Sequence, residues 1–442
     1  MNPLQYSMIR TLERVFVVIA LVFLMGGMEP FISSWTPRQD LAVDTGGSGD
    51  IRFQILSLSI YSIGITFLLM DYRRAWKLIA GNPLIFALLI YLLFSAFWSP
   101  YPATTFRRGF ALVLTTAFAM YLVLRFSPKE LLVLLGWAFV LACAMSYFFA
   151  LFTVWGKHRI GPHTGLWRGT FGHKNVQGLF AAMTVFVMLL LQADSRGPIR
   201  WLWWATIGAA IGLLYMANSA TSIATLVGVI ATWPAVRALR RGRLPLNVKL
   251  PVVLIVTFGI VLVAGVQILT LGLEALGRSE TLTGRTTLWT AAIHEGMKNA
   301  WFGVGYRTFW TEAGARNVYA QLSWEGMRNG HNGYLDVWLE LGIAGCVLLG
   351  LAFAKTVKRV WQRLVTSTDN VGVFYALFLA FLLVYSFPER VILEQSNLMW
   401  ALFLMTSFWL TPQRVPAVRT APRPVHIAAP PTSFGGRSPQ RG

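Results

Sequence analysis

The chain has 442 residues, of which 55% are hydrophobic, 14% are aromatic and only 13% are charged. About a quarter of the residues in a soluble domain are usually charged, so this composition excludes an ordinary soluble globule and indicates a membrane protein. The net charge of +20 would suit nucleic-acid binding, but the Lys and Arg residues lie between apolar segments. We therefore expect membrane lipid as a partner and no nucleic acid.

Apolar segments recur along nearly the whole chain, and each has roughly the length that crosses a ~30 Å hydrocarbon core. We predict an all-α integral membrane protein with about 12 transmembrane helices, in which residues 1–411 form one polytopic membrane domain. The predicted spans are 14–33, 53–70, 83–97, 109–125, 131–153, 176–193, 201–216, 222–237, 251–272, 333–354, 370–387 and 397–411.

The Lys and Arg residues predict the orientation, because cytoplasmic loops carry an excess of them. With both termini in the cytoplasm, most of the 38 Lys and Arg residues fall on the cytoplasmic side. Residues 273–332 then form one large loop on the outer side, with a short amphipathic helix that buries Leu288, Trp289, Ala292, Ile293 and Met297. Residues 412–442 are rich in Pro and Arg and are predicted to be a disordered cytoplasmic tail.

Polar residues collect at the outer ends of the predicted spans. The segment RGTFGHKN, at 168–175, places Arg168 and Lys174 at the start of a helix, where cations and backbone N–H groups favour an anion such as phosphate. Arg285 begins the predicted loop helix and favours an anion for the same reason. The alternatives are interfacial snorkelling for Arg168 and Lys174, and a solvated surface position for Arg285.

His331 lies in the segment NGHNGYLD, where two Asn-Gly pairs predict a sharp turn directly before a span. An imidazole at the mouth of a membrane helix is suited to accept a proton from a hydroxyl group. The alternative is a turn residue with structural hydrogen bonds only. His294 falls opposite the apolar face of the loop helix and is predicted to face solvent.

Carboxylates inside a membrane span are costly and therefore need a role. Asn332, Asp336 and Glu340 share one helix face below His331, and the carboxylates could orient His331, bind a cation or pair with Arg and Lys. Glu389, beside Arg390, is a reserve acid or base. The outer loops contain no His or Cys spacing for a metal and no P-loop, so we expect no metal and no cofactor.

Several segments together resemble the O-antigen ligase superfamily of bacterial envelope enzymes, which also includes O-antigen and exopolysaccharide polymerases. The resemblance covers nearly the whole chain. The motifs are specific for the superfamily when their order and spacing are taken together. Its motifs are SAFWSPYP at 95–102, GTFGHKN at 169–175, NSATS at 218–222, LTGRTTLW at 282–289, WFGVGY at 301–306 and HNGYLDVWLELGIAG at 331–345.

The resemblance implies a glycosyltransferase-C-like membrane fold in the bacterial inner membrane, with a large periplasmic loop at 273–332 and a periplasmic active site. It implies metal-independent, inverting transfer from an undecaprenyl-diphosphate-linked glycan to a glycan or lipid A-core acceptor. His331 becomes the base and Arg285 a diphosphate ligand, while Arg168 and Lys174 match less closely. The exopolysaccharide-polymerase branch is the nearer one, and the alternative is a transporter or flippase for a lipid-linked or anionic solute.

Overall fold

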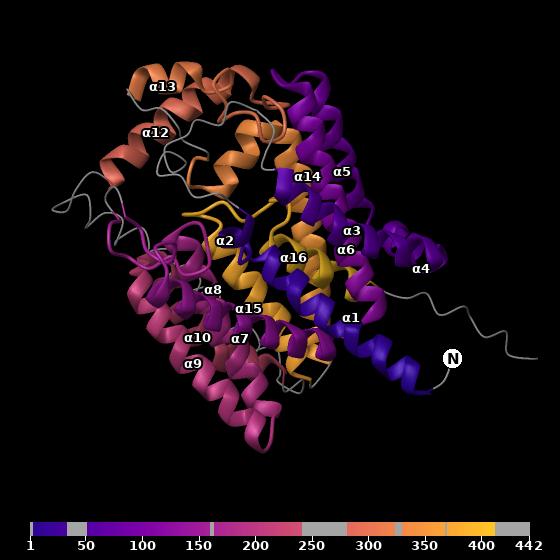
Figure 1. The fold of residues 1–442 in the computed structure, drawn as a ribbon. Helices are drawn as coiled ribbons and strands as arrows, with labels where there is room; N and C mark the ends of the chain where they lie inside the picture. The colour runs from indigo at the N-terminus through magenta and orange to yellow at the C-terminus, as the bar shows by residue number, and fades with distance from the viewer. Residues whose placement is uncertain are drawn as a thin grey trace, which may run out of the picture. The chain divides into compact units, whose positions relative to one another are not determined.

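The computed structural model describes residues 3–32, 51–159, 163–240, 281–322, 329–366 and 369–411, and these fold almost entirely as helices (Figure 1). In chain order the elements are α1 Pro3–Leu24, α2 Glu29–Ile32, α3 Ile51–Met70, α4 Tyr72–Gly81, α5 Pro83–Phe94, η2 Ser95–Phe97, α6 Pro102–Arg125, α7 Pro128–Phe152, α8 Lys174–Asp194, α9 Pro198–Ala217, α10 Ala220–Arg240, α12 Thr281–Gly296, η3 Met297–Asn299, α13 Arg316–Leu322, α14 Gly333–Thr366, α15 Asn370–Tyr385 and α16 Leu398–Trp409.

The predicted spans agree with these helices. Each of them overlaps a helix except 251–272, which lies outside the described residues, as does the predicted tail 412–442. Within the described residues, 6 helices are long and apolar enough to cross a membrane, or up to 7 if α4 and α5 form one bent span, and α10, α15 and α16 contain shorter apolar helices. The all-helical membrane fold is confirmed, and the count of about 12 spans remains a prediction.

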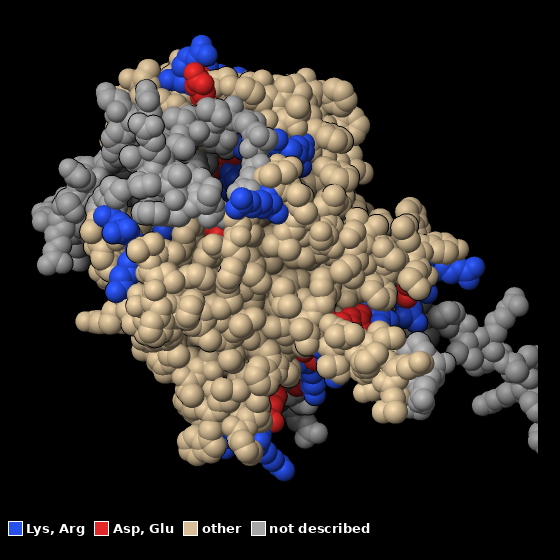
Figure 2. Space-filling model, viewed as in Figure 1, with Lys and Arg blue, Asp and Glu red and all other residues tan. Residues whose placement is uncertain are grey.

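The amount of burial distinguishes helices at the centre of the bundle from helices at its edge. In α8, 78% of the apolar window is buried inside the protein, whereas in α3 only 17% is. An apolar helix that protein does not cover is stable only in lipid. On the face drawn in Figure 2, charged side chains lie toward the two ends of the molecule, and a broad uncharged band separates them.

Helix α12 is the loop helix that the sequence predicts, and it lies with α13 near the start of α14 (Figure 1). Its residues Leu288 and Ala292 are buried in a small core with Phe309 and Trp310. Ile293 and Met297, which the helical spacing assigned to the same apolar face, are 46% and 63% exposed. The buried face is therefore narrower than the periodicity indicated.

Helix α14 contains a break that the sequence pattern does not predict. Gly342 has φ 63°, a conformation that suits glycine, and interrupts the helix nine residues after its start. The loop that follows η3 docks on this break, where Val304 N–H donates to the Leu339 carbonyl at 3.1 Å and Gly305 N–H donates to the Glu340 carbonyl at 2.9 Å. Backbone groups freed by the break are therefore satisfied within the protein, as a lipid environment requires.

Candidate active site

The turn that carries His331 is held by hydrogen bonds on both sides. His331 has φ 49°, and its N–H donates to Asn329 Oδ1 at 3.0 Å. Asn332 Oδ1 accepts the N–H groups of the first turn of α14, and Gly330 N–H donates to Asp336 Oδ1 at 2.9 Å. A left-handed backbone at a non-glycine residue is uncommon, and here the surrounding bonds impose it. The imidazole is consequently presented from a rigid backbone, with 32% of its side chain exposed.

Glu389 faces this imidazole from the segment between α15 and α16. The distance from His331 Nδ1 to Glu389 Oε2 is 3.5 Å, and the Glu389 side chain is 15% exposed. Asn175, in the first turn of α8, donates from Nδ2 to the other carboxylate oxygen, Oε1, at 2.7 Å. Three segments that are distant in the sequence thus converge on one carboxylate and one imidazole.

The segment GHKN holds Asn175 in this position. His173 precedes α8, and its Nδ1 accepts the Asn175 N–H at 3.2 Å, so it caps the helix. The Tyr385 hydroxyl donates to the Asn175 carbonyl at 3.1 Å. The motif therefore positions an amide against Glu389.

Three histidines pack against one another beside the pair of His331 and Glu389. The ring centroids of His158, His163 and His173 are 5.1 to 5.7 Å apart. Burial lowers the pKa of His173 to about 3, although the nearby Glu389 opposes this, and burial also lowers the pKa of His163. The His173 ring is therefore neutral at pH 7. In the described ranges, no cluster of three His, Cys, Asp or Glu residues is placed to hold a metal ion.

The predicted cations occupy different environments. Arg168 is only 2% exposed, and its guanidinium stacks on the Trp155 ring and donates to the carbonyls of Trp155 and Gly172 at 2.6 and 3.4 Å. Lys174 begins α8 and is partly exposed, and its Nζ donates to the Asn218 carbonyl at 3.2 Å. The structure therefore places Arg168 inside the loop and Lys174 at its surface.

Arg285 lies within α12, but its side chain is outside the described part of the structure. The helix itself is anchored one turn further on, at Trp289. Trp289 Nε1 donates to the Gly330 carbonyl at 2.7 Å, and its ring lies 6.2 Å from the Phe387 ring. The backbone of Arg285 is therefore one turn away from a residue that contacts the His331 turn.

A buried ion network supports the site from below. Arg390 makes a bidentate bond to Glu340, at 2.5 and 2.8 Å, and its Nε donates to Glu394 at 3.1 Å. Arg307 also binds Glu394, at 2.8 Å, and Asp336 accepts from Trp310 Nε1 at 2.7 Å. Glu340, Asp336 and Arg390 are almost fully buried. These groups fix α14 against the segment that carries Glu389.

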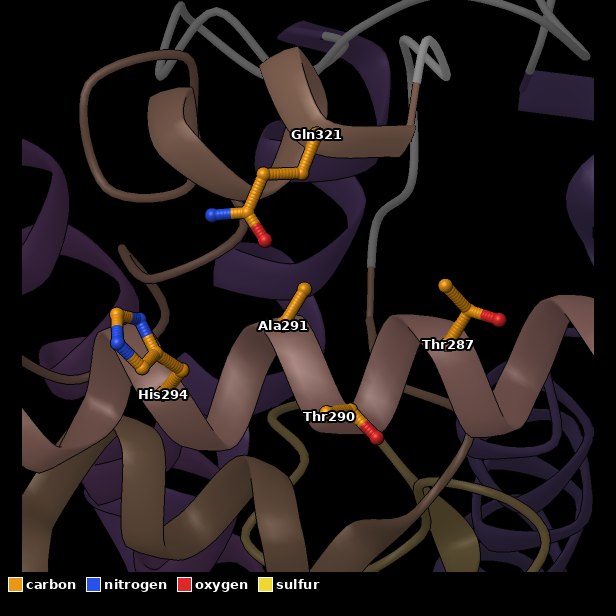
Figure 3. A pocket seen from close by; sticks show the side chains of 5 residues that line it. All are labelled: Thr287, Thr290, Ala291, His294 and Gln321. Atoms are coloured by element: carbon orange, nitrogen blue, oxygen red, sulfur yellow. The ribbon is translucent and has the colours of Figure 1, made fainter.

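A shallow hollow lies between α12 and α13, with a volume of about 370 Å³ (Figure 3). Gln321 extends from α13 toward α12, where His294 and Ala291 line the other wall, and His294 is exposed as the sequence predicts. The remaining lining residues, Thr287 and Thr290, are also uncharged. A diphosphate requires cations, so this hollow is a weaker candidate for its binding than the region around Lys174.

Two comparisons with known proteins bear on the family of this chain. Residues 204–350 match the family model described as O-antigen ligase. The chain is also 28% identical over 335 residues to the exopolysaccharide production protein ExoQ of Rhizobium meliloti (strain 1021), and the match covers 70% of this chain and 72% of that protein. The matched family is the one that the sequence motifs resemble, and the match covers about a third of the chain. The resemblance predicted from the sequence motifs is thereby confirmed.

The O-antigen ligase match extends from α9 to the middle of α14, so it includes Arg285, His331, Asp336 and Glu340. Lys174 and Glu389 lie outside the matched range. The tertiary structure brings them to the candidate site. Sequence reasoning missed the pairing of Asn175 with Glu389 and the histidine cluster. Three histidines within 158–173 were the only signal for the cluster.

Proposed function

We propose that this chain transfers or polymerises glycan carried on undecaprenyl diphosphate, on the periplasmic side of the bacterial inner membrane. The acceptor is a hydroxyl group of a growing glycan or of lipid A-core. We favour an exopolysaccharide polymerase, because the relative it resembles is named an exopolysaccharide production protein. The observation that supports the proposal most directly is the approach of Glu389 Oε2 to His331 Nδ1, at 3.5 Å.

His331 acts as the base in this proposal. Glu389 lies on the Nδ1 side of the ring, so a proton held on Nδ1 points at the carboxylate and the lone pair of Nε2 accepts the acceptor proton. The carboxylate orients the ring and stabilises the imidazolium that forms. Catalytic hydrogen bonds are often long before substrate binds, so a distance of 3.5 Å is compatible with this role.

Lys174 and Arg285 bind the diphosphate. Lys174 is next to Asn175, which contacts Glu389, and Arg285 lies one turn before Trp289, which contacts the His331 turn. Arg168 holds the loop beneath them, since it donates to the Trp155 and Gly172 carbonyls. Charge on the leaving diphosphate increases in the transition state, and cations placed there lower the barrier.

The reaction is a single displacement with inversion and without a metal. An acceptor hydroxyl oxygen forms a bond to the anomeric carbon, and the bond from that carbon to the diphosphate oxygen breaks. The hydroxyl proton moves to Nε2 of His331, and the lipid diphosphate leaves with the bonding electron pair. Cleavage of the glycosyl diphosphate bond makes the transfer favourable, so the reaction requires no nucleotide cofactor.

The alternative is a transporter or flippase, and the break in α14 is the feature that favours it. Transporters use broken helices whose free backbone carbonyls bind ions near the bilayer midplane. Here protein donors bind the carbonyls at the break, including Tyr91 O–H, which donates to Leu341 at 2.8 Å. The break is therefore better explained as a docking point for the loop after η3, and we favour the enzyme.

The test compares donor affinity with single-turnover rate on purified protein, using the lipid-linked repeat unit extracted from a strain that lacks this chain. His331→Ala should retain donor binding, while turnover falls by ~10²- to 10⁴-fold because the base is lost. Arg285→Ala should weaken both binding and turnover, and Arg285→Lys should restore them in part, since it keeps the charge but loses the bidentate fork.

His294→Ala is the matched control, because it removes an exposed histidine from α12 and should leave both quantities unchanged. Near-normal turnover in His331→Ala would exclude His331 as the base and transfer that role to Glu389, Asp336 or Glu340.

A further inference from the structure

Helix α4 leaves the bundle at a right angle. It is bent by 90° from α5 across a break at Asn82, and Figure 1 shows it projecting from the side of α3 and α6. Its C-terminal residue, Gly81, contacts the far half of α14, whereas α12 contacts the first half. Helix α4 therefore lies at the end of the bundle opposite the candidate active site.

The bend is fixed by hydrogen bonds. Arg359 donates to the Gly81 carbonyl at 2.8 Å and to Asn82 Oδ1 at 2.6 Å, and Lys355 donates to the same Gly81 carbonyl at 3.1 Å. Asn82 is only 2% exposed, and its Nδ2 donates to the Leu78 carbonyl and to Thr411. The direction of α4 is thus set by buried side chains.

One side of α4 carries two exposed aromatic residues. Tyr72 and Trp76 lie one turn apart on this side, next to Ile79, which is partly buried against the core. Tyr72 is 61% exposed and Trp76 is 66% exposed. Tyr and Trp are the residues that concentrate at membrane interfaces, because each combines an apolar ring with a polar group.

The other face of α4 is basic. Arg73, Arg74 and Lys77 are all exposed, and Arg74 pairs with Asp71 at 3.4 Å. A helix with aromatic residues on one side and cations on the other is suited to lie in the plane of the membrane surface. Its charge complements anionic headgroups, since each Lys or Arg near such a surface adds to the attraction.

We propose that α4 lies flat in the membrane interface at the α14 C-terminal end of the bundle, and that Arg73, Arg74 and Lys77 bind anionic phospholipid headgroups. Trp76 and Tyr72 insert below the headgroups, and the buried bonds at Gly81 and Asn82 hold the helix at that depth. The proposal does not depend on the proposed reaction. In the orientation predicted from the Lys and Arg residues, the leaflet concerned is the cytoplasmic one.

The lipid part is tested on full-length protein purified with mixed phosphatidylglycerol and phosphatidylcholine, by counting retained lipids with native mass spectrometry. Arg73→Gln with Lys77→Gln should lower phosphatidylglycerol retention by about an order of magnitude and leave phosphatidylcholine unchanged. The matched control is Arg196→Gln with Arg200→Gln, which removes two exposed cations, one just before α9 and one in its first turn. An equal loss in both double variants, or no loss in the α4 variant, would overturn the proposal.

The depth of α4 is tested with nitroxide labels in bilayers, after Cys143 and Cys346 are replaced by Ala. A label on Trp76→Cys should collide more with oxygen than with a water-soluble nickel complex, and a label on Lys77→Cys should do the reverse. Equal exposure of both labels to the nickel complex would mean that the helix lies in water, which would also overturn the proposal.

Discussion

Asn175 connects two parts of the chain that are 214 positions apart. Its amide donates to Glu389 at 2.7 Å, and its N–H is bound by His173. The amide donates to one carboxylate oxygen of Glu389, Oε1, and the second oxygen, Oε2, faces His331. We therefore expect Asn175 to be a positioning residue that acts on the proposed base through Glu389.

Replacement of Asn175 by Ala should lower turnover roughly tenfold at unchanged donor affinity, less than the ~10²- to 10⁴-fold expected for loss of the base itself. Asn175→Asp should be worse, because it places a second negative charge against Glu389. Single-turnover rates and donor binding measure both effects. The control is Asn370→Ala, which removes an exposed bond to Asp194 at 2.5 Å. A parallel loss of donor affinity would contradict the positioning role.

His173 predicts a pH dependence of stability. Burial lowers its pKa from 6.5 to about 3, so between these values the unfolded chain binds a proton that the folded chain does not. Unfolding is therefore favoured as the pH falls from about 6.5 toward 3. His173→Gln should make the melting temperature less sensitive to acid over this range, and exposed His294→Gln should not. Equal slopes in wild type and His173→Gln would refute this assignment.

At the scale of elements, the break in α14 joins the loop helices to the membrane domain. A Cβ atom built on Gly342 would lie 2.3 Å from the backbone of Trp301, and φ 63° is unfavourable for any residue with a side chain. The residues around this glycine hold the loop after η3, and through α12 they support the His331 turn. A single glycine thus determines where the loop docks.

Gly342→Ala should therefore destabilise the protein by more than the ~1–2 kcal/mol of backbone strain alone, and should also lower activity. Gly350→Ala is a control in the same helix, since a Cβ there meets no atom within 4 Å, and it should be neutral or slightly stabilising. Thermal unfolding in detergent, followed by size-exclusion chromatography, compares the two. Similar melting temperatures would show that the break is not required.

At the scale of the whole molecule, the candidate active site and α4 occupy opposite ends of α14. The first half of that helix contacts α12 and the Glu389 segment, and its second half contacts Gly81. Figure 2 shows charged side chains toward both ends of the molecule, separated by an uncharged band. A membrane that covers the band would place the two sites in different compartments.

Cysteine labelling in intact spheroplasts tests this orientation. Thr164→Cys and Gln321→Cys, both exposed and near the candidate site, should react with an impermeant thiol reagent. Arg196→Cys and Lys358→Cys are also exposed but should react only after lysis, because the Lys and Arg distribution places them in the cytoplasm. Labelling of Arg196→Cys from outside would reverse the topology and move the proposed site to the cytoplasm.

The membrane class, the helix positions and the loop helix were predictable from the sequence, because hydrophobic length and periodicity are local properties of the chain. His331 and Arg285 were singled out by their motifs, and the superfamily match covers both. The Asn175–Glu389 contact, the Arg390–Glu340 pair and the Arg359–Asn82 bond at the bend join residues that are 50 to 277 positions apart. Such pairs form only when helices pack, since desolvated polar groups must find partners wherever the fold brings them. The sequence alone thus determined the candidate residues, and only the tertiary structure decided which of them meet.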